Sequence, residues 1–255
     1  MKEIDFNNES IKYAITELKR RIGEDATIMS SFDDKFETGC NLCGKCCRDR
    51  NDILLTVYDV RNIRKGLNMP FKELVLQYID MYLGSDSKLP VLSVKFRNER
   101  DGRHRTVCPF LRQVRGKYLC KVNDFKPNLC RLFPVGKVTI APENTALYVA
   151  GKTECLPKEE QFMTSLRDWV GGEELQDINS RWSNAFVKKD TMLKESFDGI
   201  ESAMVKDPEL LFLAACYIYD TNVNLNEDEA IKEYLNPESE NNKLLSHYIE
   251  DRMNK

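Results

Sequence analysis

Nitrogen ligands and long apolar runs are both scarce in this sequence. Its 255 residues include two histidines, His104 and His247, so a metal site must draw mainly on other ligands. No run approaches about eighteen consecutive apolar residues, which predicts no membrane-spanning helix. The N-terminal residues 1–6 are charged and lack the apolar core of a secretory signal. We therefore expect a cytoplasmic protein with no membrane association.

Excess charge of either sign is also lacking. Lysine and arginine number 38 against 41 acidic residues, a net charge of −3. This balance gives no general attraction to nucleic acid or to an anionic membrane. Specific nucleic-acid binding is therefore not expected, and a protein or peptide is the expected kind of partner.

Familiar catalytic signatures are missing as well. The sequence has no G-x-G-x-x-G loop after a strand, no H-E-x-x-H and no nucleophile elbow. The C-x3-C-x2-C spacing of radical-SAM enzymes fails because Cys43 and Cys47 fit its first two positions but Arg50 occupies the third. The residues alone therefore assign no catalytic side chain, and whether the chain is an enzyme stays open.

What the sequence does have is the make-up of a folded domain, with 31% charged and 42% hydrophobic residues. A chain of this length can bury a core without metal. The expected fold class is α+β, predominantly helical, with a small antiparallel sheet that organises a cysteine-rich metal site. We expect residues 1–156 to form a cysteine-cluster metal-binding α+β region. Residues 157–255 should form a helical region that can share the same core.

Local patterns predict the elements. Thr56 followed by Asp59 predicts a capped helix start, and that helix should end near Gly66. Asp207-Pro208-Glu209 predicts another helix start. A loop is expected over 23–38, and turns at Asp101-Gly102 and Arg115-Gly116. The other expected helices are 8–22, 71–83, 157–170, 172–189, 190–205, 207–220, 227–235 and 239–253. The expected strands are 91–96, 107–111, 118–122, 137–140 and 146–150.

Cysteine is the residue that the sequence concentrates. Of nine cysteines, eight lie between residues 40 and 155: Cys40, Cys43, Cys46, Cys47, Cys108, Cys120, Cys130 and Cys155. The first four form a C-x2-C-x2-C-C run. Crowded thiolates select zinc, copper(I) or iron–sulfur clusters. Disulfides are uncommon in the cytoplasm, and the ninth cysteine, Cys216, lies in an apolar helix and is expected to be a core residue.

The spacing favours iron over zinc. A C-x2-C-x2-C run completed by a distant Cys-Pro is typical of a 4Fe–4S cluster, and Cys108 precedes Pro109. Structural zinc sites more often use two C-x2-C pairs, so zinc is the alternative. Eight cysteines suffice for two sites. Neighbouring side chains do not easily reach one small ion, so we expect the adjacent Cys46 and Cys47 either to serve different sites or to bridge a shared arrangement.

Several segments together resemble the YkgJ-type cysteine-cluster family, described as a zinc- or iron-chelating domain, which includes flagellin lysine-N-methylases. The segments, in order, are Gly39–Cys47, Leu55–Val60, Cys108–Leu111, Cys120 and Lys126–Pro134. The resemblance covers about residues 39–155 and implies that the eight cysteines named above bind metal. One departure is Lys126, where the family usually has arginine. Arg131, directly after Cys130, is a candidate to donate hydrogen bonds to a cluster or its thiolates, or to form a structural salt bridge.

Three functions follow as hypotheses. The first is an iron–sulfur protein that modifies a protein or peptide in the manner of a lysine N-methylase, with S-adenosylmethionine implied by the family alone. The second is a non-catalytic, zinc-stabilised module that binds a partner. The third is an electron-transfer or redox-sensing iron–sulfur protein.

Overall fold

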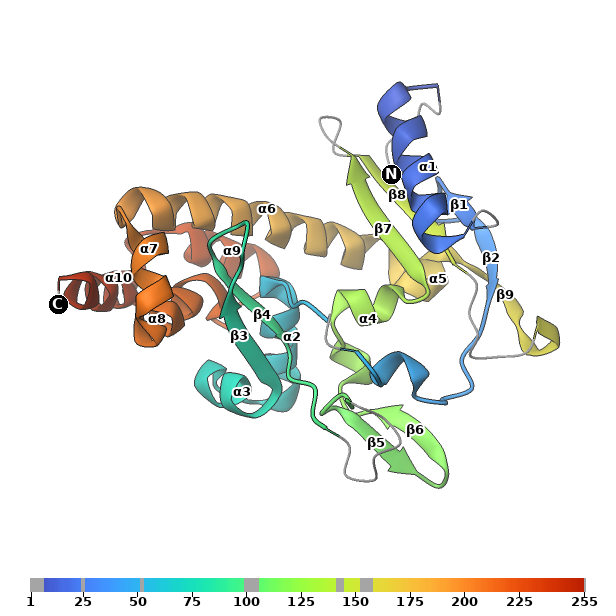
Figure 1. Cartoon of the computed structure of the whole chain (residues 1–255), viewed down its shortest axis with the longest axis horizontal. Coiled ribbons are helices and arrows are strands. Elements are labelled where there is room, and N and C mark those ends of the chain that lie inside the picture. Colours follow the sequence, from blue (N-terminus) through green and yellow to red (C-terminus); the bar gives the residue numbers. More distant parts are fainter. Residues whose placement is uncertain are drawn as a thin grey trace. The chain divides into compact units, whose positions relative to one another are not determined.

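The fold was analysed in a computed structural model, which describes residues 7–23, 26–50, 53–98, 106–140, 145–151 and 158–254. Helices and four small antiparallel sheets make up the described part (Figure 1), which confirms the expected α+β class. The chain divides into two compact units, each built from two separate stretches. Unit 1 comprises residues 1–43 and 128–177, and unit 2 comprises residues 44–127 and 178–255. The predicted regions 1–156 and 157–255 are a different partition, and that division stays a prediction.

Unit 1 is organised around a three-stranded sheet in the order β1-β8-β7. Its strands are β1 (Thr27–Met29), β7 (Val135–Ile140) and β8 (Thr145–Ala150), so the predicted pair 137–140 and 146–150 is confirmed. Helix α1 (Glu9–Ile22) begins where the Asn8 side chain accepts hydrogen bonds from the backbone of Ser10 and Ile11. Helices α4 (Asn128–Leu132) and α5 (Leu166–Val170) complete the unit's core with Met29, Phe32, Phe36 and Tyr148.

Two predictions in unit 1 are wrong for one reason. Strand β2 (Lys35–Thr38) lies in the predicted loop 23–38, as does β1. Strand β9 (Phe162–Ser165), preceded by the 3-10 turn Lys158–Glu160, lies in the predicted helix 157–170, of which α5 is helical. β2 and β9 pair with each other, antiparallel, from Lys35–Ser165 to Thr38–Phe162. A pairing across such a distance in sequence leaves no local pattern.

Unit 2 begins with the 3-10 turn η1 (Lys45–Cys47) and helix α2 (Val57–Leu67). The predicted capping box is confirmed, with the Thr56 side chain accepting from the Asp59 backbone and Asp59 accepting from the Thr56 backbone. The helix ends at Asn68, in a left-handed conformation, rather than at Gly66. Helix α3 (Phe71–Tyr78) is shorter than the predicted 71–83, because Ile79–Leu83 forms β3 against β4 (Pro90–Val94).

The second hairpin of unit 2 joins β5 (Leu111–Val114) to β6 (Lys117–Cys120) through the predicted Arg115-Gly116 turn. Arg115 and Gly116 both have positive φ, 49° and 80°, as a two-residue hairpin turn requires. The predicted strands 107–111 and 118–122 are therefore shifted. The predicted turn at Asp101-Gly102 lies outside the described residues.

Helices make up the rest of unit 2. They are α6 (Gly172–Ser196, of which residues 172–177 belong to unit 1), α7 (Ile200–Lys206), α8 (Pro208–Tyr219), α9 (Glu227–Leu235) and α10 (Glu240–Met253). The caps predicted for α8 hold, with Asp207 accepting from Glu209 and Leu210. Helix α6 is continuous where two helices, 172–189 and 190–205, were predicted. No described helix combines the length and the apolar character needed to span a membrane.

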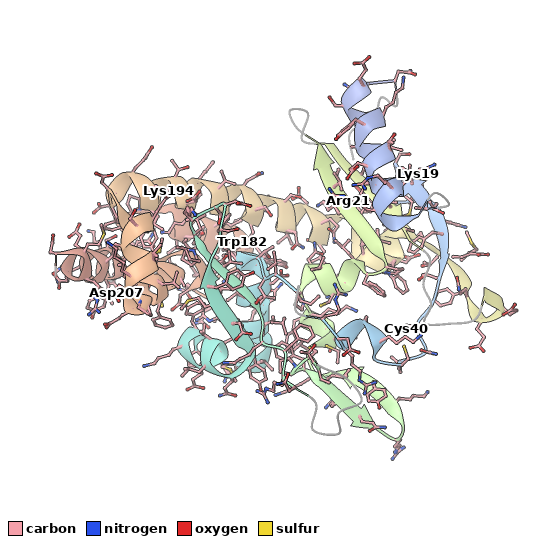
Figure 2. All side chains as sticks on the ribbon, viewed as in Figure 1. Lys19, Arg21, Cys40, Trp182, Lys194 and Asp207 are labelled. Carbon is pink, nitrogen blue, oxygen red and sulfur yellow. The ribbon has the colours of Figure 1, made fainter. Side chains whose placement is uncertain are left out.

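A buried arginine ties α2 to this helical part. The side chain of Arg61 is fully buried and donates to the backbone carbonyls of Asn222 and Leu225 and to the Glu227 carboxylate. Trp182 of α6 (Figure 2) donates its indole N–H to the same carboxylate over 2.7 Å. The helix that follows the cysteine run is thus anchored to the start of α9.

Candidate metal centre

The turn η1 brings two cysteine sulfurs together. Gly44 precedes it at φ 73°, and the Cys47 N–H donates to the Gly44 carbonyl over 3.0 Å. Within this turn the Sγ atoms of Cys46 and Cys47 lie 3.8 Å apart. The tight 3-10 turn therefore allows both sulfurs to approach one ion, and the assignment of Cys46 and Cys47 to different sites stays a prediction.

Two more cysteines of unit 2 flank the β5–β6 hairpin. Cys108, just before β5, donates its backbone N–H to the Cys47 carbonyl over 2.9 Å, and the side chains of the two residues are hydrogen-bonded. Cys120 ends β6, directly opposite Leu111 in the sheet register. Its thiol interacts electrostatically with those of Cys46 and Cys47. These four thiols, from η1 and from the open base of the hairpin, therefore form one group in unit 2.

Packing holds this group in place. A Cβ built on Gly44 would lie 3.0 Å from the Tyr118 Cβ, so β6 packs directly on the turn. The Arg48 guanidinium lies 3.9 Å from the centroid of the Tyr118 ring. At the hairpin base, Phe110 is buried and stacks on Tyr78 at 4.8 Å between ring centroids. The hairpin therefore has a fixed attachment to η1 and to α3.

Three of these thiols, those of Cys46, Cys47 and Cys120, resist ionisation on their own. The hydrogen bond that the Cys47 thiol donates to Cys108, together with burial, raises the pKa of Cys47 to about 12. The hydrogen bond with Cys47 and burial also raise the pKa of Cys46, and burial raises the pKa of Cys120. Cys46, Cys47 and Cys120 are therefore neutral thiols at neutral pH, and a metal ion must displace their protons in order to bind.

The remaining cysteines of the run belong to unit 1. Cys40 is exposed and Cys43 half-buried, and Cys130 is half-buried on α4. Cys155 lies outside the described residues. The eight described cysteines are all free thiols rather than disulfides. Over the described ranges, no three or more His, Cys, Asp or Glu side chains already surround one ion position.

Other predicted residues take different places. Arg131 of α4 is half-buried, and its side chain runs past Gly171, where a Cβ would meet its Cδ at 3.4 Å. Its role toward a cluster stays a prediction. His104 lies outside the described residues, and His247 is exposed on α10, 3.4 Å from an Asp251 carboxylate oxygen. Cys216 is buried in α8, as expected of a core residue.

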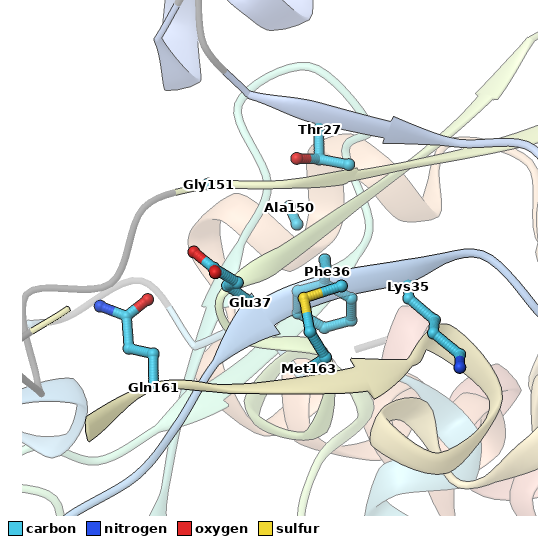
Figure 3. A pocket seen from close by; sticks show the side chains of 8 residues that line it. All are labelled: Thr27, Lys35, Phe36, Glu37, Ala150, Gly151, Gln161 and Met163. Atoms are coloured by element: carbon cyan, nitrogen blue, oxygen red, sulfur yellow. The ribbon is translucent and has the colours of Figure 1, made fainter. Parts of the chain in front are cut away.

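Unit 1 also holds a cavity that the sequence did not predict (Figure 3). Its volume is about 300 Å³, and its lining combines the charged Lys35 and Glu37 with the apolar Phe36 and Met163. Pairing of β2 with β9 creates it, so no local sequence signal could have found it. None of the described cysteines lines it.

Comparison with known families matches residues 39–156 to the family CxxCxxCC, described as "Putative zinc- or iron-chelating domain". The matched segment contains every cysteine of the chain except Cys216, and the match supports metal binding by this segment. Searches of curated proteins and of solved structures each gave no significant match.

Proposed function

We propose that this chain, whose residues 39–156 form a domain of the CxxCxxCC family, is a metal-stabilised module that holds a single tetrahedral ion on Cys46, Cys47, Cys108 and Cys120. The observation that carries the proposal is the 3.8 Å between the sulfurs of Cys46 and Cys47. A tetrahedral zinc ion with zinc–sulfur bonds of about 2.3 Å has sulfur–sulfur edges of about 3.8 Å. Sulfurs that bind separate irons of a cubane lie farther apart.

The donor set fits zinc best. Four cysteine sulfurs are a common structural zinc set. Nitrogen ligands are scarce, since the chain has two histidines. When bound, the ion supplies the positive charge that keeps the thiolates deprotonated. Arg50 acts on Cys46, and Lys126 and Arg112 act on Cys120, each favouring the thiolate through its positive charge. These cations also offset the negative charge of a four-thiolate site.

The proposed role of the ion is mechanical. Cys108 and Cys120 stand at the two ends of the β5–β6 hairpin, and Cys46 and Cys47 stand on the turn beneath it. A two-stranded hairpin alone is at best marginally stable in water. A shared ion would join its two ends to η1 and, through the following segment, to α2. We therefore infer a module that presents a rigid surface to a protein partner.

A second candidate is an iron–sulfur cluster on the cysteines of unit 1, where Cys40 and Cys43 supply a C-x2-C pair. Its ligands would be Cys40, Cys43 and Cys130, with Cys155. Modification of a protein or peptide, as by a lysine N-methylase with S-adenosylmethionine, belongs to this candidate. Calorimetric binding of S-adenosylmethionine to anaerobically purified protein would favour it.

The proposal is tested by elemental analysis of anaerobically purified protein and of two single variants. Cys108→Ser should lose one equivalent of zinc, because it removes one of the four proposed ligands. Cys216→Ser, a buried thiol outside the matched segment, is the control and should keep the full content. Iron and acid-labile sulfide in place of zinc, or unchanged zinc in Cys108→Ser, would overturn the assignment.

A further inference from the structure

Positive charge is concentrated around the unit 2 thiols. Residues 44–50 and 106–127 contain eight lysines and arginines but two acidic residues, Asp49 and Asp124. The remainder of the chain therefore has 30 basic residues against 39 acidic ones, from totals of 38 and 41. These two segments are therefore locally positive, whereas the rest of the chain is negative. The net charge of the whole chain gives no general attraction to polyanions.

The β5–β6 hairpin presents this charge on one face. Residues directly opposite in an antiparallel pair share a face. Arg112 is opposite Leu119, and Val114 is opposite Lys117, so these four side chains lie on the same side. The other face carries Leu111 and Tyr118, which pack against Gly44. The face with Arg112 and Lys117 is thus the one turned away from η1, and we call it the basic face.

The charges of this face are available to a partner. Arg112, Arg115 and Lys117 are exposed, and none forms an ion pair with another described residue. Arg115 occupies the turn itself. Of these three, Arg112 acts electrostatically on Cys120, whereas neither Arg115 nor Lys117 has a resolved influence on a thiol. The positive charges of Arg115 and Lys117, at the tip of the hairpin, are therefore exposed to solvent.

The mixed character of the face favours a protein partner over nucleic acid. Val114 is 41% exposed and lies between the cations, and Leu119 is half-buried beside them. Binding of single-stranded nucleic acid relies on exposed aromatic rings, and the hairpin's aromatic residue, Tyr118, is on the opposite face under Arg48. Alternating cations and aliphatic groups instead match an extended segment that alternates acidic and aliphatic side chains.

The backbone offers the matching interaction. Among the described strands, β5 and β6 pair with each other alone, so each has an outer edge that no described strand covers. An extended peptide can add to such an edge through main-chain hydrogen bonds. Figure 1 shows the hairpin projecting beyond α2 and α3 of its own unit. We propose that the β5–β6 hairpin is a docking site for an extended acidic segment of a partner protein.

The test uses the full-length, metal-loaded protein and fluorescence anisotropy. The probe is a labelled synthetic peptide in which aspartate alternates with valine, and a lysine–valine peptide and DNA oligonucleotides, single-stranded and duplex, are compared with it. The binding variant is Arg112→Glu/Arg115→Glu/Lys117→Glu. The matched control, Lys188→Glu/Lys206→Glu/Lys232→Glu, makes the same change of net charge at exposed lysines of unit 2.

We expect the acidic peptide to bind, and the hairpin variant to weaken its binding by about tenfold or more while the control changes it by less than about twofold. No binding of the acidic peptide, equal loss in both variants, or preference for DNA would overturn the inference. Zinc content, measured on the same samples, separates the two proposals. If the hairpin variant loses peptide binding at full zinc content, the result supports the docking site independently of the ion. If the protein binds the peptide but holds no zinc, the result contradicts the proposed function and leaves the docking site standing.

Discussion

The Nε atom of Arg61 in α2 lies 3.3 Å from a carboxylate oxygen of Glu227, the first residue of α9. The same guanidinium also satisfies the carbonyl of Leu225 over 2.6 Å and that of Asn222. One buried cation therefore closes the loop between α8 and α9 from a helix that begins ten residues after the cysteine run.

Replacing Arg61 by methionine should strongly destabilise the protein. The substitution leaves the Glu227 carboxylate without its buried cation and two backbone carbonyls without donors. We expect the free energy of unfolding in urea to fall by about 3 kcal/mol or more. Arg181→Met, which removes an ion pair with Asp228 from a 40% exposed side chain, is the control and should cost less than about 1 kcal/mol. Equal effects of the two substitutions would contradict this account.

Lys189 should make stability depend on pH. Its amine is fully buried and donates to the Asn242 Oδ1 over 2.7 Å and to the Tyr234 carbonyl over 3.0 Å. Burial lowers its pKa to about 7, below the value of about 10.4 for a solvated lysine. Between these two values the unfolded chain binds a proton that the folded chain does not. The free energy of unfolding should therefore rise with pH across this window, by at most about 1.4 kcal/mol per pH unit.

The measurement is urea unfolding from about pH 6 to about pH 10, a range that includes both pKa values. Lys189→Met should lose this rise, whereas Lys188→Met, at the exposed neighbouring position, should follow the wild type. The comparison with the wild type removes the contributions of other groups that titrate in the window. A Lys189→Met curve parallel to the wild type would show that this amine is charged in both states.

Glycine substitutions should separate backbone strain from packing at the metal centre. Gly44 and Gly116 have similar positive φ values, 73° and 80°. A Cβ at Gly44 would meet Tyr118, whereas a Cβ at Gly116 would meet no described atom within 4 Å. Both alanine variants should lose about 1 kcal/mol from the left-handed conformation. Gly44→Ala should also weaken zinc affinity, measured by competition with a chromophoric chelator, because it pushes β6 away from η1. Equal zinc affinities in the two variants would contradict the claim that packing of Tyr118 on Gly44 positions the thiols.

The sequence predicted elements whose signals are local. The Thr56–Asp59 capping box and the Asp207-Pro208 start lie within a few residues of the helices that they begin, and both are present. The β2–β9 pair was missed because each strand depends on a partner more than a hundred residues away. Helix α3 was predicted too long for a different reason: Ile79–Leu83 has apolar residues that suit either a helix or a strand, and its pairing with β4 in a local hairpin makes it a strand.

The candidate site shows the same division. Composition and spacing identified the cysteines, and the family match covers all eight of them. The relation between Cys46 and Cys47 could not be predicted, because it depends on the left-handed Gly44 and on the packing of Tyr118 above it. That relation is the observation on which the proposal of a single ion rests.

X-ray absorption at the zinc edge tests the central proposal most directly. The sample is the Cys40→Ser/Cys43→Ser variant, in which the unit 2 cysteines remain as the intact set. We predict about four sulfur neighbours at about 2.3 Å from zinc. A first shell dominated by nitrogen or oxygen, or a protein that holds iron with iron–iron scattering in place of zinc, would contradict the assignment of one tetrahedral ion to Cys46, Cys47, Cys108 and Cys120.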